Sequence, residues 1–87
     1  MDEVELRLYL GQRVKYLRRL ASLTQARLAE KTNLSVNYIS EIETGITSPT
    51  LKTLLKIAQE LNVEVKELFN FELQVSRKNM LSSLTDA

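Results

Sequence analysis

Apolar residues recur every three or four positions along most of the chain, which is the spacing of amphipathic helices. The first such stretch covers residues 6–21. A second covers residues 25–31 after a cap at Thr24, and a third covers residues 36–44 after a cap at Ser35. The pattern therefore predicts three helices in the first half of the chain, separated by short turns.

Two more helices are predicted in the second half. Residues 51–61 have a broad apolar face, and the helix begins after Ser48-Pro49-Thr50, where either Ser48 or Thr50 can act as the cap. Residues 64–69 form a short fifth helix that closes the core. The chain has only 2 Gly and 1 Pro, which favours helices joined by short turns over a sandwich or barrel. The predicted fold class is all-α.

The pattern changes at the C-terminal end. Apolar and polar residues alternate over residues 69–75, which favours an extended strand, although a continued helix is also compatible with them. Ser76 could cap a last short helix. We expect one compact unit with an N-terminal arm and the start of the first helix at residues 1–7, a helical domain at 8–69 and an extension at 70–87.

Composition excludes most catalytic chemistry. The chain has no Cys and no His, so disulfides, thiolate nucleophiles, imidazole bases and the common zinc sites are absent. The other polar residues show no spacing typical of a catalytic pair, so we expect neither an enzyme, nor a metal, cofactor or small-molecule ligand. No apolar run approaches the roughly 20 residues of a membrane span, and Met1-Asp2-Glu3 is acidic where a secretory signal would be basic. A cytoplasmic protein without membrane contact is predicted.

The distribution of charge matters more than its sum. A net charge of +1 is low for a protein that binds nucleic acid, because phosphate neutralisation supplies most non-specific affinity. Cations are nevertheless concentrated on the first predicted helix. They are Arg7, Arg13, Lys15, Arg18 and Arg19.

The stretch from Gln25 to Thr44 has the spacing of a helix-turn-helix. A small residue is required where its two helices cross, and Ala29 is at that position. A residue that tolerates positive φ must make the turn, and Asn33 is there. One side of the second helix has no core to bury it and is free to enter the major groove of DNA. This outward strip consists of Val36, Asn37, Ser40 and Glu41.

Several motifs resemble the phage-repressor and Cro family of helix-turn-helix domains, often called the XRE family. They are Leu10-Gly11-Gln12-Arg13-Val14, Thr24-Gln25, Leu28-Ala29-Glu30-Lys31, Tyr38-Ile39-Ser40, Ile42-Glu43, Gly45, Ser48-Pro49 and Glu67-Leu68-Phe69. The resemblance spans residues 10–69. It implies a five-helix, lambda-repressor-like DNA-binding domain whose third helix enters the major groove while the second lies across the DNA backbone. Such domains usually act as two-fold dimers on a near-palindromic operator.

The resemblance assigns base reading to the outward strip. Val36 is expected to contact a thymine methyl group, and Asn37 to pair with adenine or to hold a phosphate. Ser40 matches a third reading position; the alternative for all three is a solvated helix face. Glu41 could accept a hydrogen bond from cytosine N4 or point away from the DNA.

The resemblance also assigns contacts with phosphate and a structural ion pair. The residues expected to contact phosphate are Thr24, Gln25, Tyr38, Thr47, Ser48 and Arg13. Gln25 is helped by the positive end of the helix dipole, whereas Tyr38 could instead be a packing residue and Arg13 an exposed solubilising charge. Arg18 and Glu43 match a partly buried ion pair that ties the first helix to the end of the third.

A second copy of the chain is needed to read a complete operator, because the recognition helices of a dimer must lie about 34 Å apart to enter successive major grooves. In related small repressors and controller proteins the fifth helix forms this interface. The candidates here are Val65, Leu68, Phe69, Phe71, Leu73 and Val75. Residues 70–87 lie beyond the resemblance. We expect residues 71–75 to pair with the second copy as a strand or to pack across the dimer, with Met80, Leu81 and Leu84 covering the partner. The alternative is an arm folded back on its own domain.

The sequence therefore predicts a sequence-specific transcriptional regulator that binds double-stranded DNA as a homodimer, either a repressor or a controller-type autoregulator. The alternative is an antitoxin-type protein whose tail, from Phe71 onward, binds a partner protein. A tail that pairs with its own copy would support the regulator, and a tail that orders only with a second protein would support the antitoxin.

Overall fold

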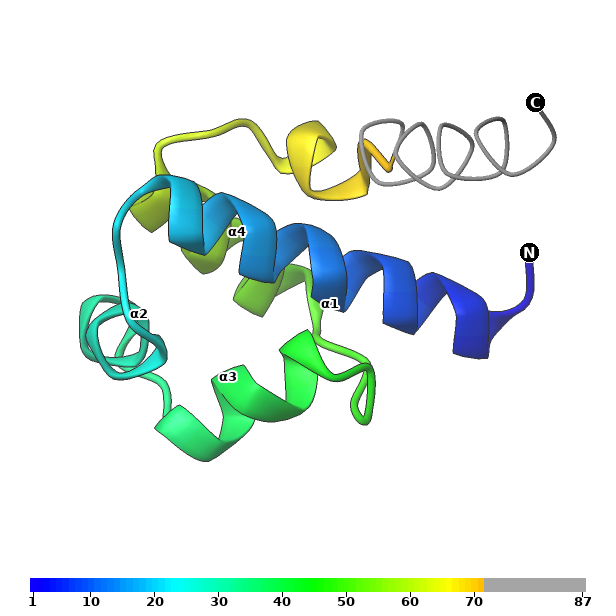
Figure 1. Ribbon diagram of the computed structural model, residues 1–87, viewed down its shortest axis with the longest axis horizontal. Coiled ribbons are helices and arrows are strands. Elements are labelled where there is room, and N and C mark those ends of the chain that lie inside the picture. Colours follow the sequence, from blue (N-terminus) through cyan, green and yellow to red (C-terminus); the bar gives the residue numbers. More distant parts are fainter. Residues whose placement is uncertain (72–87) are drawn as a thin grey trace, which may run out of the picture.

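The computed structural model describes residues 1–71 and contains helices without any strand in that part of the chain. The elements are α1 (Glu3–Leu20), α2 (Gln25–Thr32), α3 (Val36–Glu43), α4 (Leu51–Leu61) and the 3-10 helix η1 (Val65–Phe69). In Figure 1, α1 crosses the middle of the molecule, with α3 on one side of it and η1 on the other. The predicted all-α class is confirmed for the described residues.

The fifth helical element differs from the prediction, because it is a 3-10 helix and not an α-helix. Its cap residue, Glu64, makes no side-chain capping hydrogen bond, so the first turn lacks the stabilisation that the other helices have. The bonds that close it run from Glu67 N to Glu64 O and from Asn70 N to Glu67 O. A strand is expected at residues 69–75, but residues 69–71, the part of it that the structure describes, do not form one. Leu73 and Val75 lie outside the described residues.

Helix α1 begins at Glu3, earlier than the apolar periodicity indicated. The side chain of Asp2 caps it by accepting a hydrogen bond from Glu5 N at 2.9 Å. Glu3 and Glu5 lie in the first turn, where negative charge is favoured by the helix dipole, and Glu3 pairs with Arg7 at 2.8 Å. These added turns are stabilised by capping and charge, not by burial.

The predicted caps and turns hold the remaining helices in place. Thr24 caps α2 and Ser35 caps α3, each by accepting a hydrogen bond from a backbone N–H at 3.0 Å. At α4 the side chain of Thr50 accepts a hydrogen bond from Thr53 N at 3.1 Å. The cap of α4 is therefore Thr50 and not Ser48.

One hydrophobic core joins all five elements. Its fully buried large side chains are Leu28, Ile39, Ile42, Ile57, Leu68 and Val14. The apolar face of α4 is narrower than predicted, because Leu51 and Leu55 are 82% and 49% exposed while Leu54 and Ile57 face the core. The backbones of α1 and α3 approach closely at Gly11, where a Cβ would lie 2.3 Å from the carbonyl oxygen of Ile42.

Candidate nucleic-acid interface

Helices α2 and α3 form the bihelical unit that the sequence predicts. Asn33 adopts the left-handed conformation, with φ 58°, and ends α2. Leu34 N then donates to Ala29 O at 2.9 Å, which closes the turn between the two helices. Ala29 is 3% exposed and belongs to the core cluster, as expected for a small residue at the crossing. The turn therefore fixes α3 relative to α2.

Helix α3 has one buried and one uncovered face. Ile39 and Ile42 are buried against the core, whereas Val36 is 46% exposed and Asn37 is also exposed. Figure 1 shows α3 along one edge of the molecule, with no other element on its outer side. The strip of Val36, Asn37, Ser40 and Glu41, here called the α3 strip, therefore lies on the outside of this helix, with Ser40 and Glu41 half-buried.

Gln25 and Thr24 lie at the N-terminal end of α2. Thr24 is exposed, and its hydroxyl accepts from Arg27 N as the helix cap. Gln25 is half-buried, and its Nε2 donates to Glu43 Oε1 at 2.9 Å. The first N–H groups of a helix have no acceptor within the helix, so this end of α2 carries free donors and the positive end of the dipole.

Three further residues predicted to contact phosphate lie near α3, but they differ in exposure and in their hydrogen-bond partners. Thr47 and Ser48 lie in the loop between α3 and α4, half-buried and exposed respectively. Tyr38 is half-buried, and its hydroxyl donates to Thr53 Oγ1 of α4 at 3.4 Å. Its ring packs against the core cluster, so packing is at least part of its role.

Arg13 is not brought to this surface. It is 4% exposed, and its Nε donates to the backbone carbonyl of Glu67 in η1 at 2.8 Å. Its guanidinium lies 5.4 Å from the ring centroid of Tyr16. Because η1 and α3 pack on different sides of α1, the structure directs Arg13 away from the α3 strip (Figure 1). A contact of Arg13 with phosphate beside that strip does not fit this placement.

Arg18 and Glu43 form a buried, bidentate ion pair between α1 and the end of α3. Arg18 Nε and Nη2 donate to the two carboxylate oxygens of Glu43 at 2.6 and 3.0 Å, and the side chains are 8% and 2% exposed. Arg18 Nη1 also donates to Leu23 O at 2.7 Å. The hydrogen bond from Gln25 to the same carboxylate has no signal in the sequence, because no local pattern indicates a bond between residues on different helices.

The candidate dimer residues that the structure describes divide into two groups. Leu68 is fully buried in the core of its own chain, so it is not available to a second copy. Val65 is half-buried and Phe69 is 39% exposed, while the ring of Phe71 stacks on Tyr9 with centroids 5.5 Å apart. Val65, Phe69 and Phe71 thus remain at the surface beside α1.

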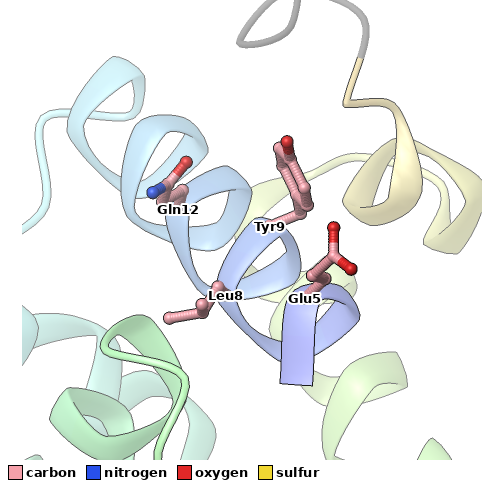
Figure 2. A pocket seen from close by; sticks show the side chains of 4 residues that line it. All are labelled: Glu5, Leu8, Tyr9 and Gln12. Atoms are coloured by element: carbon pink, nitrogen blue, oxygen red, sulfur yellow. The ribbon is translucent and has the colours of Figure 1, made fainter. Parts of the chain in front are cut away.

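A hollow of about 190 Å³ lies on α1, lined by Glu5, Leu8, Tyr9 and Gln12. In Figure 2, Glu5 and Tyr9 point to one side of the helix while Leu8 points to another, so the side chains do not converge on a common point. Within residues 1–71 no cluster of acidic side chains is arranged to hold a metal ion. Over the same residues, none of the helices has the length and apolarity needed to cross a membrane.

Comparisons with known proteins agree with this geometry. The immunity repressor protein of Bacillus phage phi105 is 38% identical over 78% of this chain, which spans 47% of the repressor. Control protein C.BamHI of Bacillus amyloliquefaciens is 37% identical over 76% of this chain and 83% of its own length. Among solved structures, the restriction-modification controller protein C.AhdI of Aeromonas hydrophila superposes with a TM-score of 0.69 and 34% identity, over 70% of this chain and 92% of C.AhdI.

The family model that matches is the helix-turn-helix family HTH_3, over residues 14–68. The match covers α2, α3, α4 and nearly all of η1, but less than half of α1, of which residues 3–13 lie outside it. These matches confirm the resemblance that the sequence motifs predicted: the chain belongs to the helix-turn-helix family, in its XRE-type branch.

Proposed function

We propose that this chain is a sequence-specific transcriptional regulator that reads the edges of DNA bases with the α3 strip. The observation that carries the proposal is the position of the strip on the outer face of α3, with Val36 and Asn37 exposed, while Ile39 and Ile42 on the other face are buried in the core. A helix presented in this way fits the major groove of B-DNA, which is wide enough to admit it. Asn37 is then placed to pair with adenine, and Val36 to contact a thymine methyl group.

The end of α2 supplies the contact with the DNA backbone in this proposal. Gln25 and the free N–H groups beside Thr24 bind a phosphate at the positive end of the α2 dipole. The loop residues Thr47, which is half-buried, and Ser48, which is exposed, bind the same strand on the other side of α3. Contacts with phosphate position the domain without selecting a sequence, so these residues determine affinity, whereas the α3 strip determines which operator is bound.

The proposed active form is a cytoplasmic homodimer on a near-palindromic operator. Val65, Phe69 and Phe71 are the described surface residues that support a contact between copies, and Leu73 and Val75 are proposed to extend it. The relatives named as an immunity repressor and as controller proteins suggest a repressor or an autoregulator.

Selection of bound sequences from a random duplex pool, at a fixed salt concentration, tests the proposal. We expect two similar half-sites in inverted orientation, with centres about one helical turn apart. Asn37→Ala should change the preferred base at one position of each half-site, and Gln25→Ala should weaken binding to all sequences alike. Equal loss on every sequence for both variants would contradict the assigned roles. Sedimentation equilibrium of the free protein tests whether the chain forms a dimer. Leu55→Ala lies outside the proposed interface, so this variant should have the same oligomeric state as the wild type.

A further inference from the structure

Glu43 lies where three helices of the domain meet. It is the last residue of α3, and its carboxylate accepts two hydrogen bonds from Arg18 of α1 and one from Gln25, the first residue of α2. Gln25 is also the residue proposed above to bind a phosphate. A buried carboxylate at the end of α3 is therefore bonded directly to a proposed backbone contact on the neighbouring helix.

We propose that Glu43 is a positioning residue, which holds the Gln25 carboxamide in the orientation in which it binds a DNA phosphate. This inference rests on the proposed function. A carboxylate only accepts hydrogen bonds, so the Gln25 side chain must turn its NH₂ group, and not its oxygen, toward Glu43. One N–H donates to Glu43 Oε1 at 2.9 Å, and the second N–H of the same group remains for an anion.

The Glu43 carboxylate, which holds Gln25, is itself fixed in position. The Glu43 side chain is 2% exposed and is gripped by Arg18 at both carboxylate oxygens. Arg18 also donates to Leu23 O, just before α2, so the same pair fixes the segment that leads into Gln25. A glutamine side chain with free rotamers would lose that freedom when it binds DNA. Gln25 has lost it already in the free protein, so its phosphate contact is preorganised.

Charge decides how the inference has to be tested. A carboxylate near phosphate is repelled unless it is neutralised, and Arg18 provides that neutralisation. Removing the charge of Glu43 would leave the Arg18 charge uncompensated and raise attraction to every phosphate. Total affinity would therefore be changed by two opposing effects, the gain from the uncompensated Arg18 charge and the loss of the preorganised Gln25 contact. The informative quantity is the effect of neutralising one phosphate at a time.

The experiment uses the selected operator, with a neutral methylphosphonate placed at one backbone position in each duplex. The phosphate that Gln25 binds is the one whose neutralisation weakens the wild-type protein about tenfold but leaves Gln25→Met almost unaffected. In Glu43→Leu, which has no acceptor for the Gln25 NH₂ group, the same neutralisation should weaken binding about twofold or less. Glu60→Leu, the same chemical change at an exposed residue of α4, should keep the tenfold effect. A tenfold effect retained in Glu43→Leu would overturn the inference.

If no operator can be selected, the proposed function fails, which is a different outcome from a retained tenfold effect. A measurement on the wild-type protein alone covers the case in which Glu43→Leu does not fold. The side-chain NH₂ of Gln25 should show an NMR order parameter near that of rigid backbone, about 0.85, while the exposed Gln12 and Gln59 fall below about 0.6. A Gln25 side chain as mobile as Gln12 and Gln59 would also overturn the inference.

Discussion

The close approach of α1 and α3 at Gly11 makes a prediction whose sign is decided by two opposing effects. Ala has a higher helix propensity than Gly by about 1 kcal/mol, so Gly11→Ala in an isolated helix would be stabilising. In the folded domain the new Cβ would lie 2.3 Å from the carbonyl oxygen of Ile42 and 2.6 Å from that of Glu43. Ordinary contacts between such atoms are about 3.5 Å, so the helices would have to separate by about 1 Å.

Both obstructing atoms belong to the backbone, so no side-chain rotamer can relieve the clash. Overpacking of this kind costs about 1–3 kcal/mol, and the rigid neighbours place this site at the upper end. After subtraction of the propensity gain, Gly11→Ala should lower the free energy of unfolding by about 2 kcal/mol. The midpoint of thermal unfolding should fall by about 10 °C in a domain of this size.

Urea denaturation followed by circular dichroism measures this change. Gln12→Ala is the matched control, because Gln12 is the next residue of α1 and is exposed, so its replacement should change stability by less than about 0.5 kcal/mol. A Gly11→Ala protein that is as stable as the wild type, or more so, would show that α1 and α3 do not approach as described. The same separation would displace the C-terminal end of α3 and so weaken binding to the operator.

Three further predictions concern the ion pair, a turn and a cap. Arg18→Leu should lower the free energy of unfolding by about 3–5 kcal/mol, because Glu43 is left buried and uncompensated, and the double replacement Arg18→Leu with Glu43→Leu should recover part of that loss in urea denaturation. No recovery in the double variant would contradict this account. At Asn33, whose φ is 58°, a Val should lower the stability by about 1–2 kcal/mol while a Gly leaves thermal unfolding nearly unchanged; equal melting of the two variants would argue against the left-handed turn. Thr50→Ala should lose about 1 kcal/mol and Ser48→Ala less than about 0.5 kcal/mol by chemical denaturation, since Thr50 is the cap of α4, and the reverse order would assign the cap to Ser48.

The helix-turn-helix could be predicted from the sequence because its signals are local. The caps Thr24 and Ser35, the positive-φ residue Asn33 and the small residue Ala29 each act within a few positions of their own place in the chain. Apolar periodicity, in contrast, places the start of α1 too late. The first turn of this helix depends on the cap at Asp2 and not on burial, so it has no apolar periodicity to detect.

The parts of the site that could not be predicted depend on contacts between distant segments. Arginine is usually exposed, but Arg13 is buried because η1 packs over α1 and offers it the Glu67 carbonyl. The burial of Leu68, by contrast, agrees with the prediction that the fifth helix closes the core, because η1 packs against α4 as well as α1. The bond between Gln25 and Glu43 likewise exists only once α2 and α3 have been brought together.

The central claim is that the α3 strip is the surface that meets DNA. NMR titration of the protein with its selected duplex tests this most directly, because each backbone amide reports on its own surroundings. The account predicts that the largest shifts fall on α3 from Val36 to Ser40 and on the start of α2 at Gln25, with small shifts on the far side of α1. Largest shifts on η1 or on the C-terminal half of α4, with α3 unchanged, would contradict it.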